Sequence, residues 1–463
     1  MNSPNGLVIF VYLCFIYTTS PVISLRLDDI VVVVLSQGDQ YHANKAEQLR
    51  QNIIEQAASI NQKPPSVRIV HKEFPHVGAW TVVPLFPWLN KLHSGNSSWF
   101  FFAEEKTQIN LTELVTLVEG YDEKEAIWMG HGLTDEEATI IHHFAFADNP
   151  SKFKYPLFSA GFVMSTALIV EMSKKYKEMA VRNSDFSIDA SHELALYVDI
   201  PLIDLPRQFC IENGVGCLSY PKHDINCGEP VPKESIFFAV KTCAKYHKDR
   251  VPVVKSTWAQ QTAFIEFFSH EQDEEIPTTV VGVENTERGH CKKSFAIVRL
   301  VNQRIKKEIP SIKWIVLADD DTLISVPRLQ TLLSCWSDSG EIAVGERYGY
   351  NVRGSKVGGF NYLTGGGGII ISASTIPHIL KNCACQGDDS PDDMFLGLCM
   401  AKLNIPLVHS PSFHQARPND YAMNYLAIQS PVSFHKHWMI DPLAVYDEWL
   451  SSSDNHVHKH TEL

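Results

Sequence analysis

The sequence has no cluster of basic residues, and this argues against nucleic-acid binding. Its 463 residues include 40 Lys and Arg against 53 Asp and Glu, which gives a formal net charge of −13. Proteins that bind DNA or RNA need grouped cations to contact the phosphates. Hydrophobic residues make up 44% and charged residues 20%, an ordinary globular balance. The length favours two or three domains over one.

The apolar stretch at the N-terminus, Gly6 to Tyr17, is shorter than the about 20 residues of a membrane-spanning helix. It has the length of a signal-peptide core, and we predict a signal peptide over residues 1–24. No basic residue precedes it, so a short type II membrane anchor is the alternative. The chain ends in HTEL, which resembles the KDEL class of retrieval signals that a receptor reads. We therefore expect a soluble resident of the endoplasmic reticulum lumen, with the tail at residues 451–463 and no stable membrane span.

The sequence also lacks the paired CxxC motifs of zinc sites. Of its ten cysteines, Cys14 lies in the predicted signal peptide and nine remain. In an oxidising lumen most should form disulfides, and an odd number leaves at least one cysteine without an intramolecular partner. The connectivity does not follow from the sequence. Asn96 and Asn110 begin N-x-S/T motifs and are the predicted glycosylation sites.

An internal repeat organises the chain. Trp99 and Trp314 each open an apolar strand, which is followed by an acidic triplet and a helical stretch. Three further pairs follow the same order: the strands at Ile30 and Ile236, FSAGFVMS and GGGGIIIS, and IPLIDLP and IPLVHSP. We predict two similar α/β domains at residues 25–228 and 229–450, joined near the Pro-, Gly- and Cys-rich stretch 217–232.

The halves differ at the positions where chemistry is expected. The triplet is DDD at 319–321 in the second half and EEK at 104–106 in the first. The four glycines at 365–368 correspond to SAGF at 159–162. A lysine in the third triplet position would place a cation where a metal ion would bind. We therefore predict that the first half is a catalytically silent copy.

Aspartates at the end of a buried strand are suited to hold Mg2+ or Mn2+, because hard cations prefer carboxylate oxygens. A diphosphate would complete the metal's coordination, and the alternative is a solvated acidic turn. The four glycines permit either close approach of a ligand or a tight turn.

A second acidic pair, Asp392 and Asp393, stands at the predicted start of a helix. One of these carboxylates can cap the helix, and the other is free to act as a general base. Four histidines follow, at positions 409, 414, 435 and 437. One of them could complete a metal site as a neutral imidazole.

The ordered motifs of the second half resemble those of Fringe-like β-1,3-glycosyltransferases. Over roughly residues 235–440 they are FFAVKTCAKYHKDRVPVVKSTW, WIVLADDDTLISVPRL, YLTGGGGIIIS, PDDMFLG and IPLVHSPSFH. The resemblance implies an inverting enzyme that uses a UDP-sugar and Mn2+. It also implies the fold: two tandem GT-A-like (Rossmann-like) α/β domains, the first degenerate and the second catalytic.

Carried over by position, the resemblance implies that Asp321 and His414 bind the metal and that Asp393, in preference to Asp392, is the catalytic base. The predicted substrate-binding residues, nucleotide side first, are Thr242, Arg250, Lys292, Asp319, Asp320, Gly366 and Gly367.

The two-half layout with a retrieval signal is similar to members of this family that add glucose from UDP-glucose to the 3-hydroxyl of O-linked fucose. Their acceptors are thrombospondin type 1 repeats. UDP-galactose or UDP-N-acetylglucosamine as donor is the alternative within the family. A non-catalytic lumenal lectin or quality-control protein is the alternative outside it. The first half could recognise the folded acceptor repeat, or only shield apolar surface of the second half.

Overall fold

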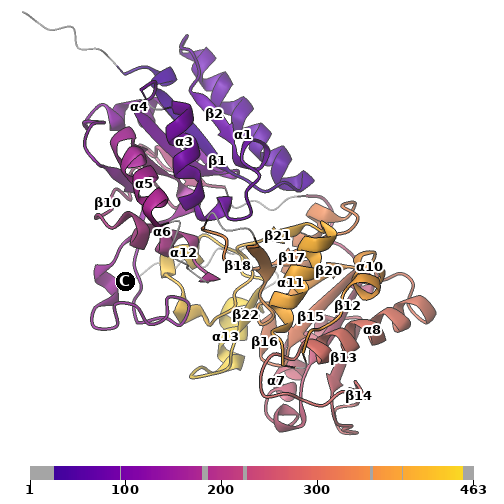
Figure 1. Ribbon diagram of the computed structural model, residues 1–463. Coiled ribbons are helices and arrows are strands. Elements are labelled where there is room, and N and C mark those ends of the chain that lie inside the picture. Colours follow the sequence, from indigo (N-terminus) through magenta and orange to yellow (C-terminus); the bar gives the residue numbers. More distant parts are fainter. Residues whose placement is uncertain are drawn as a thin grey trace, which may run out of the picture.

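The structure is a computed structural model that describes residues 25–93, 95–179, 186–222, 227–354, 358–387 and 389–451. The predicted signal peptide and the HTEL tail lie outside these residues. Figure 1 shows two α/β halves, the first coloured indigo to magenta and the second orange, with the yellow C-terminal segment at their junction. Within the described residues, no helix combines the length and the apolar character that crossing a membrane requires.

The first half is built on a six-stranded sheet in which only β8 runs antiparallel to its neighbours. In spatial order its strands are β10 (Ile203–Asp204), β5 (Trp128–Gly130), β8 (Phe162–Ser165), β3 (Trp99–Glu104), β1 (Ile30–Leu35) and β2 (Ser66–Ile69). The central strands are continuous apolar runs, as expected where both faces of a sheet are covered. The helices around it are α1 (Gln40–Ser59), α2 (Val70–Glu73), α3 (Phe86–His93), α4 (Leu111–Val118), α5 (Thr166–Met179) and α6 (Ala190–Val198).

The second half repeats this order and adds one edge strand, β14. The strands are β14 (Thr278–Val280), β13 (Phe264–Ser269), β12 (Ile236–Lys241), β15 (Trp314–Asp319), β20 (Ile369–Ser372), β17 (Ala343–Gly345) and β21 (Leu407–His409). The helices are α7 (Val251–Ser256), α8 (Cys291–Lys307), α9 (Val326–Leu333), α10 (Thr375–Asn382), α11 (Asp392–Leu403), α12 (Met423–Ala427) and α13 (Pro442–Trp449). The predicted α/β class with two similar halves is confirmed.

The repeat holds residue by residue in the strand register. Ile30 lies opposite Trp99 in the first sheet, and Ile236 lies opposite Trp314 in the second. A side-chain bridge is repeated as well. Thr107 Oγ1 accepts the Glu104 N–H at 3.0 Å and donates to the Ser159 carbonyl at 2.8 Å.

The same bridge occurs at the end of β15. Thr322 Oγ1 accepts the Asp319 N–H at 3.1 Å and donates to the Gly366 carbonyl at 2.8 Å. The two halves therefore share their architecture down to single hydrogen bonds at the edge of the sheet where the acidic triplets lie. The bridge makes Ser159 the counterpart of Gly366, so the expected match of 159–162 with 365–368 is shifted by one residue.

A short strand follows each acidic triplet, before the helix that the sequence predicted there. β4 (Thr107–Ile109) pairs with β11 (Ser219–Pro221), and β16 (Thr322–Ile324) pairs with β22 (Ser433–His435). In these pairs Thr107 lies opposite Pro221, and Thr322 lies opposite His435. Pro221 is therefore the counterpart of His435 in the first half.

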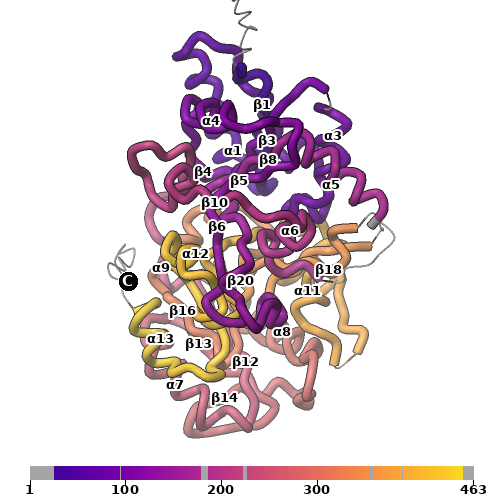
Figure 2. The backbone as a smooth tube through the Cα atoms, turned by 90° about the vertical axis from the view of Figure 1, so that its left-hand side faces the viewer, coloured from indigo at the N-terminus to yellow at the C-terminus, as the bar shows by residue number. Residues whose placement is uncertain are grey.

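The halves are joined by shared structure. β9 (Phe186–Ser187) of the first half pairs with β18 (Arg347–Tyr350) of the second, and β19 (Phe360–Leu363) completes this small sheet. Ala422 and Ile428, which flank α12, pack into the core of the first half, and Figure 2 shows α12 in yellow beside that half. The strand ends of the first half thus face the second half.

Four disulfides form among the described cysteines, and Cys243 is free. They join Cys210 to Cys217, Cys227 to Cys335, Cys291 to Cys385 and Cys383 to Cys399. The expected odd cysteine is therefore found. The last two disulfides connect the start of α8 to α11 through the segment after α10. They restrain α11, whose first turn carries the acidic pair.

Candidate active site

The three aspartates at the end of β15 point to different partners. Asp320 is buried, and it accepts hydrogen bonds from Thr242 Oγ1 at 2.7 Å and from Arg250 Nη1 at 3.0 Å. The Arg250 guanidinium lies 3.7 Å from the centre of the Tyr246 ring. Burial, together with the charge of Asp321, raises the pKa of Asp320 to about 6. Asp320 therefore holds Thr242 and Arg250 in place. These two residues were predicted to bind the substrate, and their hydrogen bonds to Asp320 bring them together.

Asp319, Asp321 and His435 form a group that fits a divalent metal, since one ligand atom of each lies within 4.8 Å of the others. His435 Nδ1 is 2.9 Å from the Gln415 carbonyl, while Nε2 faces Asp321 at 3.1 Å. An imidazole that donates from one nitrogen to a carbonyl presents the other nitrogen as a ligand, as metal-binding histidines do. Two carboxylates and one imidazole suit Mn2+.

The position of His414 corrects the sequence prediction. Its buried ring lies between the Ser433 carbonyl, 3.0 Å from Nδ1, and Gln429 Oε1, 2.8 Å from Nε2. Both nitrogens are engaged away from the acidic group, and the structure brings His435 to Asp321 instead. The reason is the pairing of β22 with β16, which delivers the last residue of β22 to the acidic strand end.

Gly366 is required by the ring of His435. A Cβ at this position would lie 2.3 Å from that ring. The neighbouring Gly367 donates its N–H to Gln415 Oε1 at 3.0 Å. Both glycines were predicted to allow close approach of a ligand. The structure shows instead that Gly366 makes room for His435, whereas a Cβ at Gly367 would lie 2.9 Å from Thr364 Oγ1. Among the four glycines it is Gly365 that faces Asp393.

A Gly366→Ala substitution tests this packing. The added methyl group should push His435 away from Asp321, so the Mn2+ concentration for half-maximal activity should rise by about tenfold. A metal titration of the transfer rate measures it. Gly38→Ala is the matched control, because nothing lies within 4 Å of a Cβ there. An unchanged Mn2+ dependence in Gly366→Ala would contradict the placement of His435.

Asp392 is held as an anion. Its Oδ2 accepts from Lys241 Nζ at 2.6 Å and from the Ser294 hydroxyl. Lys241 Nζ is also 3.1 Å from Asp319 Oδ1. Burial opposes the charged form of Asp392, but Lys241 and Ser294 outweigh it and hold the pKa of Asp392 below its usual value. A carboxylate fixed in this way is a poor proton acceptor.

Asp393 has the properties of a general base. It lies in the first turn of α11, and its Oδ1 accepts the Met394 N–H at 2.7 Å. Burial, together with the charge of Asp392, raises the pKa of Asp393 to about 6. A small cavity is lined by Lys241, Asp319, Gly365 and both aspartates of the pair. Of the two predicted bases, the geometry favours Asp393.

Comparison with known proteins shows which enzymes the chain is similar to. The model of the Fringe-like family matches residues 85–196 and 231–456. A β-1,3-glucosyltransferase of Homo sapiens is 47% identical over 440 residues, which cover 93% of this chain and 86% of that protein. The β-1,3-glucosyltransferase of Mus musculus is 46% identical over 438 residues, covering 93% and 88%. Radical fringe of Gallus gallus, a β-1,3-N-acetylglucosaminyltransferase, is 29% identical over 243 residues, covering 44% and 63%.

The chain belongs to the Fringe-like family. The predictions of a glycosyltransferase, a β-1,3-hexosyltransferase in particular, and of two tandem GT-A-like domains are thereby confirmed. The family match extends into both halves, as a repeat of one ancestral unit requires.

No contact described in the structure tests the predicted role of Lys292, which stays a prediction. Lys292 is exposed, whereas the next residue, Lys293, is buried and donates to the Thr242 carbonyl at 2.5 Å and to Asn285 Oδ1 at 2.7 Å. Successive residues of a helix point about 100° apart, so a shift of one position exchanges the inner face for the outer one. Lys293 is therefore the lysine that supports Thr242.

Two basic residues of this Fringe-like site were not predicted as functional. Lys241 is the last residue of β12 and pairs in register with Asp319, and Lys293 lies behind it. Asp319 and Asp392 raise the pKa of Lys241 against the effect of burial. The signal was present in the sequence, because the carboxyl ends of neighbouring parallel strands meet at one edge of a sheet.

The first half has lost this Fringe-like site. Glu104 and Lys106 stand at the positions of the two aspartates of the candidate metal group, and Pro221 stands at the position of His435. Asp199 and Asn404, which end α6 and α11, both have a left-handed backbone and match each other. With this match, Ile188 stands at the position of Asp393. The carboxylate is kept at the position of Asp319, as Glu104, but the counterparts of Asp321, His435 and Asp393 can neither bind a metal ion nor act as a base at neutral pH.

The two predicted glycosylation sites both lie on the surface. Asn96 is exposed in the turn before β3. Asn110 is exposed at the start of α4, where its Oδ1 caps the helix by accepting from the N–H groups of Thr112 and Glu113. A glycan attached to the side-chain nitrogen of Asn110 would leave this oxygen free to cap.

The pKa of Asp393 predicts the pH dependence of transfer. The ionised carboxylate is the active form, so kcat/KM should be full above pH 6 and fall about tenfold per unit as the pH drops below it. Because the folded state raises the pKa from 3.8, the same group lowers the stability of the fold as the pH rises through this range. Initial rates at saturating Mn2+ between pH 5 and 8 measure this fall in kcat/KM. A flat profile down to pH 5 would rule out Asp393 as the base.

Proposed function

We propose that the second half transfers glucose from UDP-glucose to the 3-hydroxyl of O-linked fucose on thrombospondin type 1 repeats. The observation that carries the proposal is the intact group of Asp319, Asp321 and His435 beside Asp393, in a chain similar over nearly its full length to β-1,3-glucosyltransferases. A carboxyl group whose pKa is raised to about 6, close to a candidate metal group and to a second carboxylate held as an anion, is typical of a catalytic site and favours an enzyme over a non-catalytic lectin.

The reaction is a single displacement. Asp393 accepts the proton of the fucose 3-hydroxyl, and the hydroxyl oxygen attacks the anomeric carbon of glucose from the face opposite UDP. The bond between that carbon and the diphosphate breaks, and the new linkage has inverted configuration. Lys241 keeps Asp392 ionised, so that Asp393 is the carboxylate of the pair that exchanges a proton.

Asp319, Asp321 and His435 would hold Mn2+, which when bound neutralises negative charge on the departing diphosphate. Arg250 lies 2.8 Å from Asp321 Oδ2 and 3.0 Å from Asp320 Oδ1. Its positive charge offsets the negative charges of Asp320 and Asp321 on the side of the site where Thr242 lies. We assign Thr242 and Arg250 to the nucleotide side of the site on this basis.

The proposed compartment is the lumen of the endoplasmic reticulum. Four disulfides among the described residues fit an oxidising environment. Entry would use the predicted signal peptide, and retention would use the HTEL tail and its receptor.

The proposal is tested with the purified full chain, a fucosylated thrombospondin type 1 repeat and a panel of UDP-sugars. We expect transfer from UDP-glucose in the presence of Mn2+, with a β-1,3 linkage to fucose in the product. The matched control is the same repeat without fucose, which should accept nothing. Turnover with UDP-galactose or UDP-N-acetylglucosamine alone would overturn the donor, and glucosylation of the unfucosylated repeat would overturn the acceptor.

A further inference from the structure

A cavity of about 230 Å3 lies between the two halves, at the strand ends of the first sheet. It is larger than the cavity at the acidic pair of the second half, about 30 Å3. Five of its lining residues are Glu104, Lys106, Ser159, Ile188 and Pro221. These are the counterparts, in order, of Asp319, Asp321, Gly366, Asp393 and His435. The cavity is therefore the active-site cleft of the silent copy, retained after its catalytic residues were lost. We call it the silent cleft.

The part of the silent cleft that corresponds to the nucleotide side is a separate cavity of about 110 Å3, and a side chain of the second half lines it. Arg347 enters from the second half, with its guanidinium 4.6 Å from the centre of the Trp80 ring and Nη1 3.4 Å from Gln37 Oε1. Arg347 and Lys106 here face Glu104 and Glu105, so the positive charges are balanced. A site without excess positive charge holds a diphosphate poorly.

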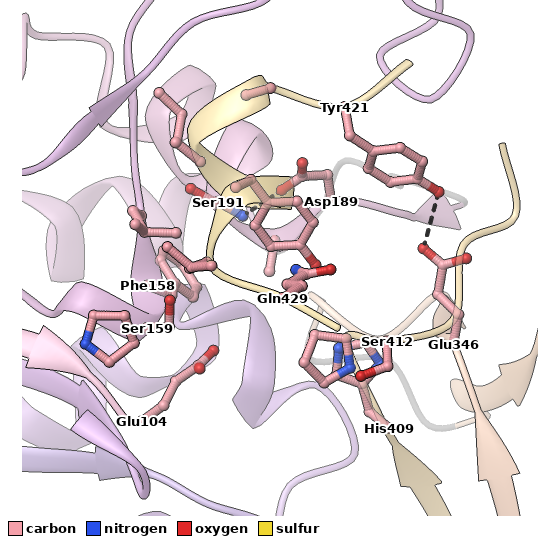
Figure 3. Close-up of a pocket in the computed structure, with 18 of the residues that line it drawn as sticks. Glu104, Phe158, Ser159, Asp189, Ser191, Glu346, His409, Ser412, Tyr421 and Gln429 are labelled. Carbon is pink, nitrogen blue, oxygen red and sulfur yellow. Dashed lines mark hydrogen bonds between the residues drawn. The ribbon is translucent and has the colours of Figure 1, made fainter. Parts of the chain in front are cut away.

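The other part of the silent cleft is open and has mixed chemistry. Figure 3 shows Glu104 and Ser159 of the first half on one side of this space and Tyr421 of the second half, whose hydroxyl points to Glu346, on the other, with Gln429 between them in this view. Tyr425 adds a second aromatic ring. Ser159 Oγ is buried and has no hydrogen-bond partner. Aromatic faces beside convergent hydroxyl, amide and carboxyl groups suit a sugar, whose C–H faces are apolar and whose rim carries hydroxyls.

Two glutamic acids of this open part, Glu104 and Glu346, have raised pKa values, whereas its third carboxyl group, Asp189, is held as an anion by His142. Burial, with the charge of Glu105, raises the pKa of Glu104 to about 7. Burial also raises the pKa of Glu346 to about 8, and Glu346 accepts a hydrogen bond from the Gln415 N–H. Neutral or half-ionised acids both donate and accept hydrogen bonds, as pairing with sugar hydroxyls requires.

One wall of the silent cleft is fixed by a buried ionic network. His142 lies between Asp135, at 2.7 Å, and Asp189, at 3.0 Å, and Tyr155 donates to Asp135 at 2.6 Å. Burial opposes its charge, but the two carboxylates raise the pKa of His142 to about 9. Asp135, His142 and His192 could also be grouped around a metal. Because both nitrogens of His142 already face carboxylates, the network instead holds Asp189 and Tyr155 against the cavity.

We propose that the silent cleft binds a neutral saccharide, so that the chain holds a non-catalytic sugar site in addition to its catalytic one. The inference does not depend on the donor or acceptor proposed above. The sugar would lie between Glu104 and Ser159 of the first half and the tyrosines of the second, and it would contact both halves.

Photo-crosslinking of the full chain tests the proposal. The probes are methyl glucoside and methyl fucoside that carry a diazirine, and labelled peptides are identified by mass spectrometry. We expect label in the peptides that contain residues 155–159 and 421–430, competed by an excess of the unmodified sugar. Label confined to peptides of the catalytic site, around residues 360–367 and 392–396, would overturn the proposal. So would labelling of the silent cleft by an azido-UDP probe that the sugars do not displace.

Two variants locate the site. Glu104→Ala removes a carboxyl group and should reduce labelling of the silent cleft by about tenfold. This is the loss of affinity expected when one hydrogen bond to the ligand is removed. Ala190→Phe places a ring in the cavity from the first turn of α6 and should abolish this labelling. Binding of Mn2+ and UDP shows that each variant is folded. Glu113→Gln, on α4 and outside the cavity lining, is the matched control. Full labelling of either folded cavity variant would contradict the assignment.

Discussion

Replacing Asp393 by asparagine should reduce glycosyl transfer by about 1,000-fold, because no other carboxylate of the site can take the proton of the attacking hydroxyl. Asp392 lies next to it but is engaged by Lys241 and Ser294. The loss should appear in kcat, with the KM for the UDP-sugar little changed. Initial rates over a range of donor concentrations measure both constants.

The stability of the same variant separates catalysis from folding. Burial raises the pKa of Asp393, so the charged carboxylate destabilises the fold at pH 7. A neutral asparagine removes that cost, and Tm should stay the same or rise. A variant that keeps at least a tenth of the wild-type rate would show that Asp393 is not the base. A large fall in Tm would show that the loss of activity has a structural cause.

Replacing His435 by alanine should raise the Mn2+ concentration for half-maximal activity by about 100-fold or more, because it removes the single nitrogen ligand of the metal group. Activity should recover in part at high Mn2+, since Asp319 and Asp321 remain. Titration of the transfer rate with Mn2+ measures the change in Mn2+ affinity during turnover. Electron paramagnetic resonance measures Mn2+ binding without turnover.

His414→Ala is the matched control for this prediction. His414 is buried between Ser433 and Gln429 and does not reach the acidic residues. Its loss should lower Tm and leave the Mn2+ dependence of the surviving activity unchanged. The reverse pattern, with weakened Mn2+ binding in His414→Ala and normal binding in His435→Ala, would restore the ligand that the sequence predicted.

The fold of this chain could be predicted from sequence because its core strands are buried on both faces. Such strands, as at Ile30 and Ile236, read as continuous apolar runs, and their order survives in both halves. The acidic strand end and the start of α11 followed from the same pattern. The prediction of a silent first half needed only the replacement of three aspartates by EEK.

The details of the site depended on contacts that the sequence does not display. β16 and β22 have three residues each, too few to show an alternating pattern, so nothing indicated that their pairing would carry His435 to Asp321. Lys292 and Lys293 are adjacent in sequence, and only the orientation of α8 decides which of them faces Thr242. The silent cleft needed both halves, because Arg347 and Tyr421 come from the second.

The central claim is that only one of the two similar halves holds a metal and diphosphate site. The most direct test is the stoichiometry of Mn2+ binding to the full chain in the presence of UDP, measured by electron paramagnetic resonance. The account predicts one bound ion per chain, lost in Asp321→Asn and retained in Glu105→Gln, the neighbouring acid of the silent copy. Two ions per chain, or one ion that persists in Asp321→Asn, would contradict it.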